Sequence, residues 1–210
     1  MKKVLVLVVL FILPLVAYLF FASGVNNFGR LPILTEKVTD VASLSSAHTF
    51  KDKITILGFL GSDIEYVKGN AFNLNQKIYK RFYEFNDFQM IMIVPNGAEE
   101  EIKDLKEELG QLADTKKWNF VFADSSGIKT LFKGLKTNLS LDKNLGNPNV
   151  FIIDKDKNLR GRDDDEEEEV KYGFNTISVA DLNNKMEDDV KVILAEYRLA
   201  LKKNNANRIK

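Results

Sequence analysis

Four runs of consecutive apolar residues divide the chain after residue 50 and predict buried β-strands. A strand that is covered on both faces is apolar along its whole length, whereas a half-buried strand alternates. The four runs read ITILGFL (54–60), FQMIMIVP (88–95), WNFVFAD (118–124) and NVFIID (149–154). After the last run, the segment KDKNLRGR predicts a turn into a short fifth strand.

Helical patterns fill the intervals between these strands. Residues 69–85 have a one-sided apolar spacing, and residues 97–114 and 125–135 predict two more helices. The helix over 97–114 has acidic residues in its first turn, where the helix dipole favours them. A last helix begins at Ser178, a good N-cap residue with Asp181 three positions on. The expected apolar stripes comprise Phe72, Leu74, Ile78, Phe82 and Phe85 in the first helix and Leu182, Met186, Val190, Ile193, Tyr197 and Leu201 in the last.

Strands that alternate with helices predict an α/β sandwich around a central mixed sheet of four or more strands, with at least one parallel pair. We place this domain at residues 41–203, followed by a polar tail at 204–210. Residues 25–40 contain glycine, asparagine and proline and are expected to form a linker.

The N-terminus carries a long apolar run. Lys2 and Lys3 precede an almost unbroken apolar segment over residues 4–22. A helix of this length spans the bilayer core of about 30 Å, and lysines before it favour a cytoplasmic N-terminus. Residues 1–24 are therefore expected to be a signal-anchor in the lipid bilayer of the inner (cytoplasmic) membrane, with the domain on the periplasmic side. The alternative is a long signal peptide that is cleaved near Ala22 or Gly24.

The charge balance and the absence of cysteine exclude several classes of function. The chain has 30 Lys and Arg and 30 Asp and Glu, and this balance gives no electrostatic argument for nucleic-acid binding. The sequence contains no cysteine, which removes disulfides, thiol redox chemistry and thiolate metal ligands. We therefore expect no enzyme activity and no cofactor.

Three pieces of sequence carry a family resemblance: ILGFLGSD (56–63), VFIIDKDKNLRGR (150–162) and the last helix. With the order of the elements between 45 and 203, they make the chain similar to the Sco/SenC family. Members of that family are membrane-anchored copper chaperones and thiol reductants that help to assemble the copper centre of cytochrome oxidase. The resemblance implies a thioredoxin-like sandwich behind a membrane anchor.

The functional residues of that family do not carry over. Its two cysteines fall on Ser62 and Tyr66, and its histidine falls near Gly146 or Asn147. Copper(I) prefers soft thiolate ligands, and thiol exchange needs a thiolate. We therefore expect a non-catalytic binding or assembly module for a protein partner in the membrane or envelope, such as a respiratory oxidase complex. The alternative is a residual metal carrier or thiol-pathway oxidoreductase that uses ligands other than cysteine.

Individual residues near the first strand have competing interpretations. Ser62 as a nucleophile would need a nearby base, and the only histidine, His48, is interpreted as structural or solvent-facing. Asp63 and Glu65 are two positions apart and do not face each other on a helix, so we interpret them as charges at a helix N-terminus. Tyr66 either fills the space of the missing cysteine or, if exposed, offers an anchor for a partner.

Two later segments each have more than one interpretation. The resemblance implies a cis peptide bond before Pro148, which we favour over a trans proline at the start of a strand. The acidic run DDDEEEE (163–169) is expected to be a solvated loop. Its alternatives are a weak site for a hard cation such as calcium, or a contact with a basic patch on a partner.

The expected partner-binding face therefore lies where the first strand meets its helix, beside the proline segment. It comprises Phe59, Leu60, Gly61, Ser62, Asp63, Tyr66, Gly146, Asn147 and Pro148.

Overall fold

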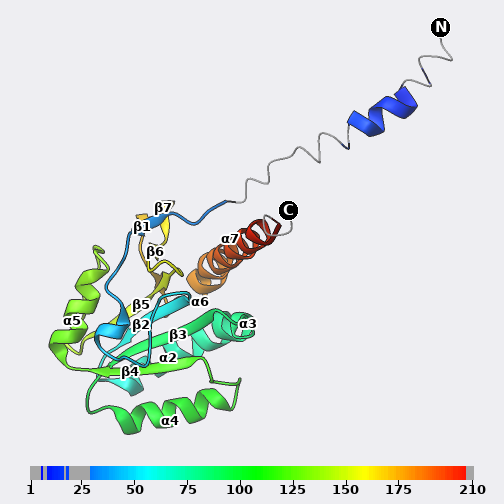
Figure 1. Ribbon diagram of the computed structural model, residues 1–210. Coiled ribbons are helices and arrows are strands. Elements are labelled where there is room, and N and C mark those ends of the chain that lie inside the picture. The colour runs from blue at the N-terminus through cyan, green and yellow to red at the C-terminus, as the bar shows by residue number, and fades with distance from the viewer. Residues whose placement is uncertain (1–5, 7–8, 17, 19–28, 207–210) are drawn as a thin grey trace.

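The computed structural model describes residues 6, 9–16, 18 and 29–206, with the backbone alone for residues 200–206 (Figure 1). The strands are β1 (Ile33–Thr35), β2 (Ile54–Leu60), β3 (Phe88–Pro95), β4 (Trp118–Ala123), β5 (Gly146–Ile153), β6 (Leu159–Arg160), β7 (Arg162–Asp165), β8 (Glu169–Lys171) and β9 (Phe174–Asn175). The helices are η1 (Val41–Ser43), α2 (Ile64–Leu74), η2 (Asn75–Tyr79), α3 (Lys80–Phe82), α4 (Glu99–Gly110), α5 (Ser125–Gly134), α6 (Val179–Asp181), η3 (Leu182–Met186) and α7 (Glu187–Ala206). Of these, η1 is a 3₁₀ helix, and η2 and η3 are π-helical turns.

The sheet has the topology of a thioredoxin-like fold. Its strand order is β1-β6-β5-β2-β3-β4, and β9 pairs with β5. The pairs β2·β3 and β3·β4 are parallel, whereas β5 runs antiparallel to β2 and to β6. The predicted mixed sheet with a parallel pair is therefore confirmed, and so are the four apolar runs as its central strands.

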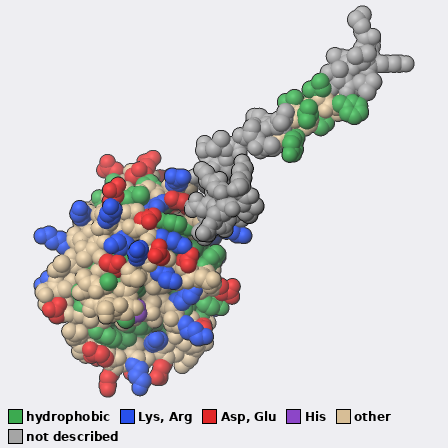
Figure 2. All heavy atoms as spheres, viewed as in Figure 1, with side chains coloured by type: hydrophobic (Ala, Val, Ile, Leu, Met, Phe, Trp, Pro, Cys, Tyr) green, Lys and Arg blue, Asp and Glu red, His purple; other side chains and the backbone are tan. Residues whose placement is uncertain are grey.

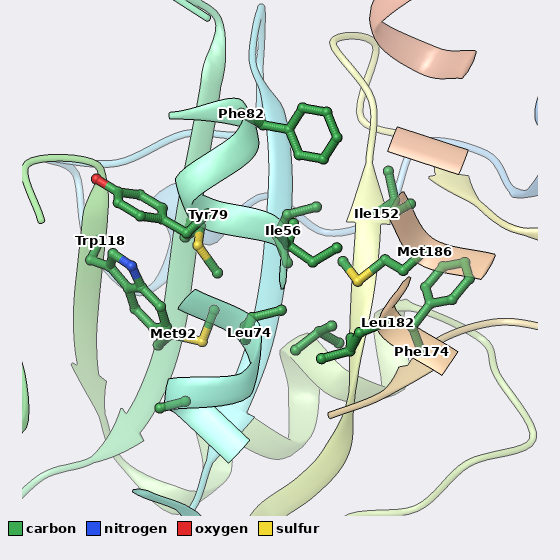
Figure 3. Packing of buried hydrophobic residues seen from close by; sticks show 14 of the residues in the cluster. Ile56, Leu74, Tyr79, Phe82, Met92, Trp118, Ile152, Phe174, Leu182 and Met186 are labelled. Carbon is green, nitrogen blue, oxygen red and sulfur yellow. The ribbon is translucent and has the colours of Figure 1, made fainter. Parts of the chain in front are cut away.

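Helices cover both faces of this sheet and create two hydrophobic cores. Alternate residues of a strand point to opposite faces, so Ile56 and Met92 enter one core while Leu57 and Ile93 enter the other. The first core is closed by residues of α2, η2, α4, η3 and α7, and the second by residues of η1 and α5. Figure 3 shows the first core, in which Leu182 and Met186 from η3 reach toward the strands from the side opposite Trp118.

The helix predicted over residues 69–85 begins at Ile64 and contains a π-helical turn. Within that turn the buried Asn75 accepts a hydrogen bond of 3.2 Å from the indole nitrogen of Trp118. Leu74, Ile78 and Phe82 face the core as expected. The prediction is wrong for Phe85, which lies beyond α3 and is 46% exposed.

The segment expected to be a linker contributes to the folded domain. Ile33 and Thr35 in β1 pair with β6, and Leu31 and Val38 are 5% and 3% exposed. Burying these two side chains favours the attached conformation, because removing apolar surface from water is favourable. The domain therefore starts ten residues earlier than the predicted boundary, at Leu31 instead of residue 41.

The last helix begins as the sequence predicts. The Ser178 hydroxyl accepts a hydrogen bond of 3.2 Å from the backbone N–H of Asp181. Leu182, Met186, Val190 and Ile193 are fully buried. The helix continues through residue 206, into the expected polar tail.

Of the expected membrane anchor, residues 4–22, the structure describes residues 6, 9–16 and 18, and the others lie outside the described residues. Within the described part of the chain, we find no helix whose length and apolar content suffice to cross a bilayer.

Candidate functional site

The turn after β2 is held against the start of β5. Gly61 has a φ of 76°, a left-handed conformation that favours glycine, and a Cβ there would come within 2.9 Å of the Asn144 carbonyl oxygen. The backbone N–H of Ser62 donates a hydrogen bond of 3.0 Å to that same carbonyl. Leu60 pairs with Gly146 across the two strands. The two segments that we expected to form one site therefore touch each other through their backbones.

The two acidic residues after this turn support the start of α2. The carboxylate of Asp63 caps the helix by accepting a hydrogen bond of 3.2 Å from the backbone N–H of Tyr66. Glu65 lies in the first turn of the helix, where the dipole favours a negative charge. The interpretation of both residues as charges at a helix N-terminus is confirmed.

Tyr66 points into solvent. Its exposed fraction is 78%, so the interpretation of this side chain as a buried filler is wrong. Tyr66 is the third residue of α2. In this first helical turn, the residue that faces the core is Ile64, which is buried. Phe59, near the end of β2, points into the second core, where its ring packs edge-on against Phe132 at a centroid distance of 5.1 Å. Tyr66 is thus an exposed aromatic side chain on a fixed helical position.

Pro148 is preceded by a trans peptide bond, because none of the described peptide bonds is cis. The expected cis bond is therefore wrong. Pro148 lies where the pairing of β5 with β2 shifts register, between the pairs formed by Asn147 and by Phe151. A proline without an N–H is tolerated at such an irregularity in its usual trans form.

A contact that the sequence did not indicate fixes the proline segment. The carbonyl oxygen of Pro148 accepts hydrogen bonds from the backbone N–H and the hydroxyl of Thr176, at 2.9 and 2.6 Å. The carbonyl oxygen of Thr176 in turn accepts a hydrogen bond of 3.1 Å from the Asn73 side chain in α2. No local signal marks Thr176, since its partners are 28 and 103 residues away.

Between these three segments lies a narrow crevice that reaches the first core, too small to be a substrate cavity. Its lining includes Leu60, Val67, Asn147 and Thr176, and its volume is about 20 Å³. That volume holds roughly one water molecule. We call the surface around it the site face and define it as Leu60, Ser62, Asp63, Tyr66, Asn147 and Pro148. Phe59, Gly61 and Gly146, which we expected on it, are buried.

Serine catalysis finds no support in the geometry of the site. Among the described residues, the Ser62 hydroxyl forms no hydrogen bond to a base, although an activated nucleophile needs one within about 3 Å. His48 is half-buried between η1 and β2, and its backbone N–H donates to Ser45. The described part of the chain also contains no group of three or more His, Cys, Asp or Glu side chains that could hold a metal ion.

The acidic run forms a hairpin instead of the expected solvated loop. Asp163–Asp165 belong to β7, and Glu169 begins β8. Asp165 is 6% exposed and accepts a hydrogen bond of 2.9 Å from Lys185 in η3. Burial alone would raise the pKa of Asp165, but the hydrogen bonds from Lys185 and from the Glu167 amide outweigh it and hold this pKa below its ordinary value. The other six carboxylates of the run, at residues 163, 164 and 166–169, remain exposed as expected, and Figure 2 shows acidic side chains at the edge where Figure 1 places β7.

Fold and site together define a thioredoxin-like domain whose turn after β2 carries Ser62 and whose following helix carries Tyr66. No protein-family model matches the sequence, and no curated protein matches it either.

Several solved structures resemble the chain at low sequence identity. A SCO1/SenC family lipoprotein from Bacillus anthracis is 16% identical, and the match covers 81% of this chain and 99% of that one at a TM-score of 0.47. An Aquifex aeolicus protein described as a putative electron transport protein is 18% identical over 79% and 96% of the two chains, also with a TM-score of 0.47. A thiol:disulfide interchange protein of the thioredoxin family from Chlorobium tepidum is 16% identical over 79% and 99%, with a TM-score of 0.46. The fold assignment rests on the strand order and not on these similarities.

Proposed function

We propose that this protein is a non-catalytic binding or assembly module that engages a protein partner through the site face. The observation that carries the proposal is the 78% exposure of Tyr66, at a position that the Sco/SenC resemblance assigns to a cysteine, in a chain without cysteine. Tyrosine provides a large contact area at low entropic cost, which is why it is common among residues that dominate binding energies.

The surroundings of Tyr66 support a binding surface. Pro148 is exposed, and Ile177, which directly follows Thr176, is 57% exposed. Both segments are tied to α2 through the hydrogen bonds of Thr176. An exposed apolar group on a preorganised backbone loses little entropy on binding, so this face is suited to recognition without chemistry.

Membrane tethering is the second part of the proposal. Residues 4–22 would anchor the protein in the cytoplasmic membrane, with the domain on the periplasmic side and its partner in the membrane or envelope, for example a respiratory oxidase complex. The support is the length of the apolar run and the two lysines before it. N-terminal sequencing of the native protein tests this part. A mature terminus near Val25, with the protein in the soluble fraction, would contradict it.

Affinity purification of the full-length protein from its own membranes in a mild detergent tests the binding face. We expect a co-purifying protein, identified by mass spectrometry, that is lost from the Tyr66→Ser variant while the thermal melt is unchanged. Phe85→Ser is the matched control, because Phe85 is 46% exposed before β3, at the opposite end of the parallel strands from Tyr66. A partner that the Tyr66 variant retains, or that both variants lose equally, would place the interface elsewhere.

A further inference from the structure

A groove runs between α5 and the segment that leads into β5. Its volume is about 580 Å³, which lies within the range of ligand-binding pockets. It is on the face of the sheet that α5 covers, whereas Tyr66 belongs to α2 on the other face. The groove is therefore a second surface, separate from the site face.

The floor of the groove is apolar. Phe132 contributes the edge of the second core, and Leu139, Leu141 and Leu145 pack partly buried against that core. The four side chains come from both walls of the groove. A ligand that covers these apolar side chains would bind favourably, because it removes apolar surface from water.

The rim of the groove is basic. Lys129 and Lys133 are four positions apart and lie along one side of α5, and Lys136 lines the groove just after the end of that helix. All three are exposed, and none takes part in an ion pair within the described part of the chain. The helix dipole favours Lys133 in the last turn, but it gives no benefit to Lys129 in the middle of the helix. Like charges at this spacing repel each other, which a negatively charged ligand would relieve.

One carboxylate lines the groove, and it is already engaged. Oδ1 of Asp142 accepts hydrogen bonds of 2.8 Å from the backbone N–H groups of Asn144 and Gly146. Asp142 therefore supports the turn into β5 and does not pair with the lysines. The groove keeps a positive rim in a protein whose formal net charge is zero.

We propose that this groove binds an acidic segment of a partner protein in which apolar side chains are interspersed with carboxylates. The carboxylates would meet the three lysines, and the apolar side chains would cover the floor of Phe132, Leu139 and Leu145. A nucleic acid fits less well, because single strands need exposed aromatic rings for stacking and Phe132 is 8% exposed.

Selection from a random peptide library on the full-length protein in mild detergent tests the proposal. The enriched peptides should combine acidic and apolar residues, and synthetic copies should bind in fluorescence anisotropy. The triple variant Lys129→Glu, Lys133→Glu, Lys136→Glu should weaken this binding by about tenfold or more, and the corresponding glutamine variant should weaken it less. The matched control carries the same lysine-to-glutamate changes at Lys51, Lys103 and Lys106, three exposed lysines outside the groove. It should bind the peptides as the native chain does.

Four results would overturn the proposal: no enrichment, enriched peptides without acidic residues, equal binding by the native chain and the triple glutamate variant, or equal loss in the control. A second copy of the chain is the remaining occupant, with its acidic hairpin in the groove. Concentration-dependent dimers in sedimentation, abolished by the triple variant, would assign the groove to that contact and overturn the partner assignment.

Discussion

Arg160 and Asp154 form an ion pair that is buried on both sides: Nη1 of Arg160 lies 2.9 Å from Oδ2 of Asp154, and the side chains are 4% and 1% exposed. The other donors of Arg160 contact the carbonyl oxygen of Leu31 at 2.8 Å and the Glu196 carboxylate at 2.6 Å. One guanidinium group thus joins the N-terminal segment, the β5–β6 hairpin and α7. The Leu31 and Glu196 partners lie 129 and 36 residues away along the chain, so this contact links the beginning and the end of the domain.

Replacing Asp154 with alanine should destabilise the domain strongly. The change leaves the Arg160 charge buried without this carboxylate, and it removes an acceptor from the backbone N–H groups of Asp156 and Asn158. Breaking a buried pair from one side costs about 3–5 kcal/mol of unfolding free energy. Urea denaturation measures the loss.

The control for this variant is Asp114→Ala. Asp114 pairs with Lys116 at 3.0 Å, but the two side chains are 44% and 86% exposed, so the loss of unfolding free energy should be much smaller than for Asp154→Ala. Equal effects of the two substitutions would mean that the Arg160 contact does not hold the domain together.

Gly61→Ala should destabilise the site turn. An alanine there keeps a left-handed φ at a cost of about 1–2 kcal/mol, and its Cβ meets two backbone groups at 2.9 Å, the carbonyl of Asn144 and the N–H of Gly146. Gly69→Ala is the comparison, because Gly69 is exposed in the middle of α2 with no atom near its Cβ position. That change should stabilise the helix by about 0.5–1 kcal/mol. Thermal melts that move in the same direction for both variants would contradict the described turn.

Asp165 should make the stability of the domain sensitive to acid. Its pKa in the folded state is below the ordinary value of 3.8, so its contribution is fully present above that pH and is lost as the pH falls through the lower, folded value. The native chain should therefore lose more stability between about pH 5 and pH 3 than the Asp165→Asn variant does. Asp163→Asn, at an exposed position of the same strand, should behave as the native chain. Urea midpoints at several pH values separate these outcomes.

The sequence predicts the central sheet because its strands are marked by local patterns. Each apolar run corresponds to one strand, and the cap at Ser178 is likewise a local signal. Features that depend on distant partners were missed or wrong. Leu31 joins the domain through Arg160, and Asp165 is buried through Lys185, although the acidic run around it suggests a loop. The exposure of Tyr66 cannot be read from the sequence, because one turn of helix does not reveal which residue faces the sheet.

Introducing cysteines at residues 62 and 66 tests whether the turn has the geometry of a copper site, which the Sco/SenC resemblance implies. The native domain should bind no copper(I) tightly, because the turn offers only oxygen ligands at Ser62, Asp63 and Tyr66. Ser62→Cys with Tyr66→Cys should create at least weak affinity, and each single cysteine variant serves as a control. A histidine fits better at Asn147 than at Gly146, where a Cβ would lie 3.1 Å from the Leu60 carbonyl oxygen. Competition against a copper(I) chelator gives the affinities, and tight binding by the native chain would contradict the non-catalytic role.

The most direct test of partner binding through the site face is photo-cross-linking from residue 66. A benzoyl-phenylalanine in place of Tyr66, in the full-length protein within its own membranes, samples what this exposed position touches. The same probe at Leu112, which is 40% exposed after α4, is the control. The account predicts a distinct protein adduct from residue 66 that residue 112 does not form. No protein adduct from residue 66, or the same adducts from both positions, would contradict it.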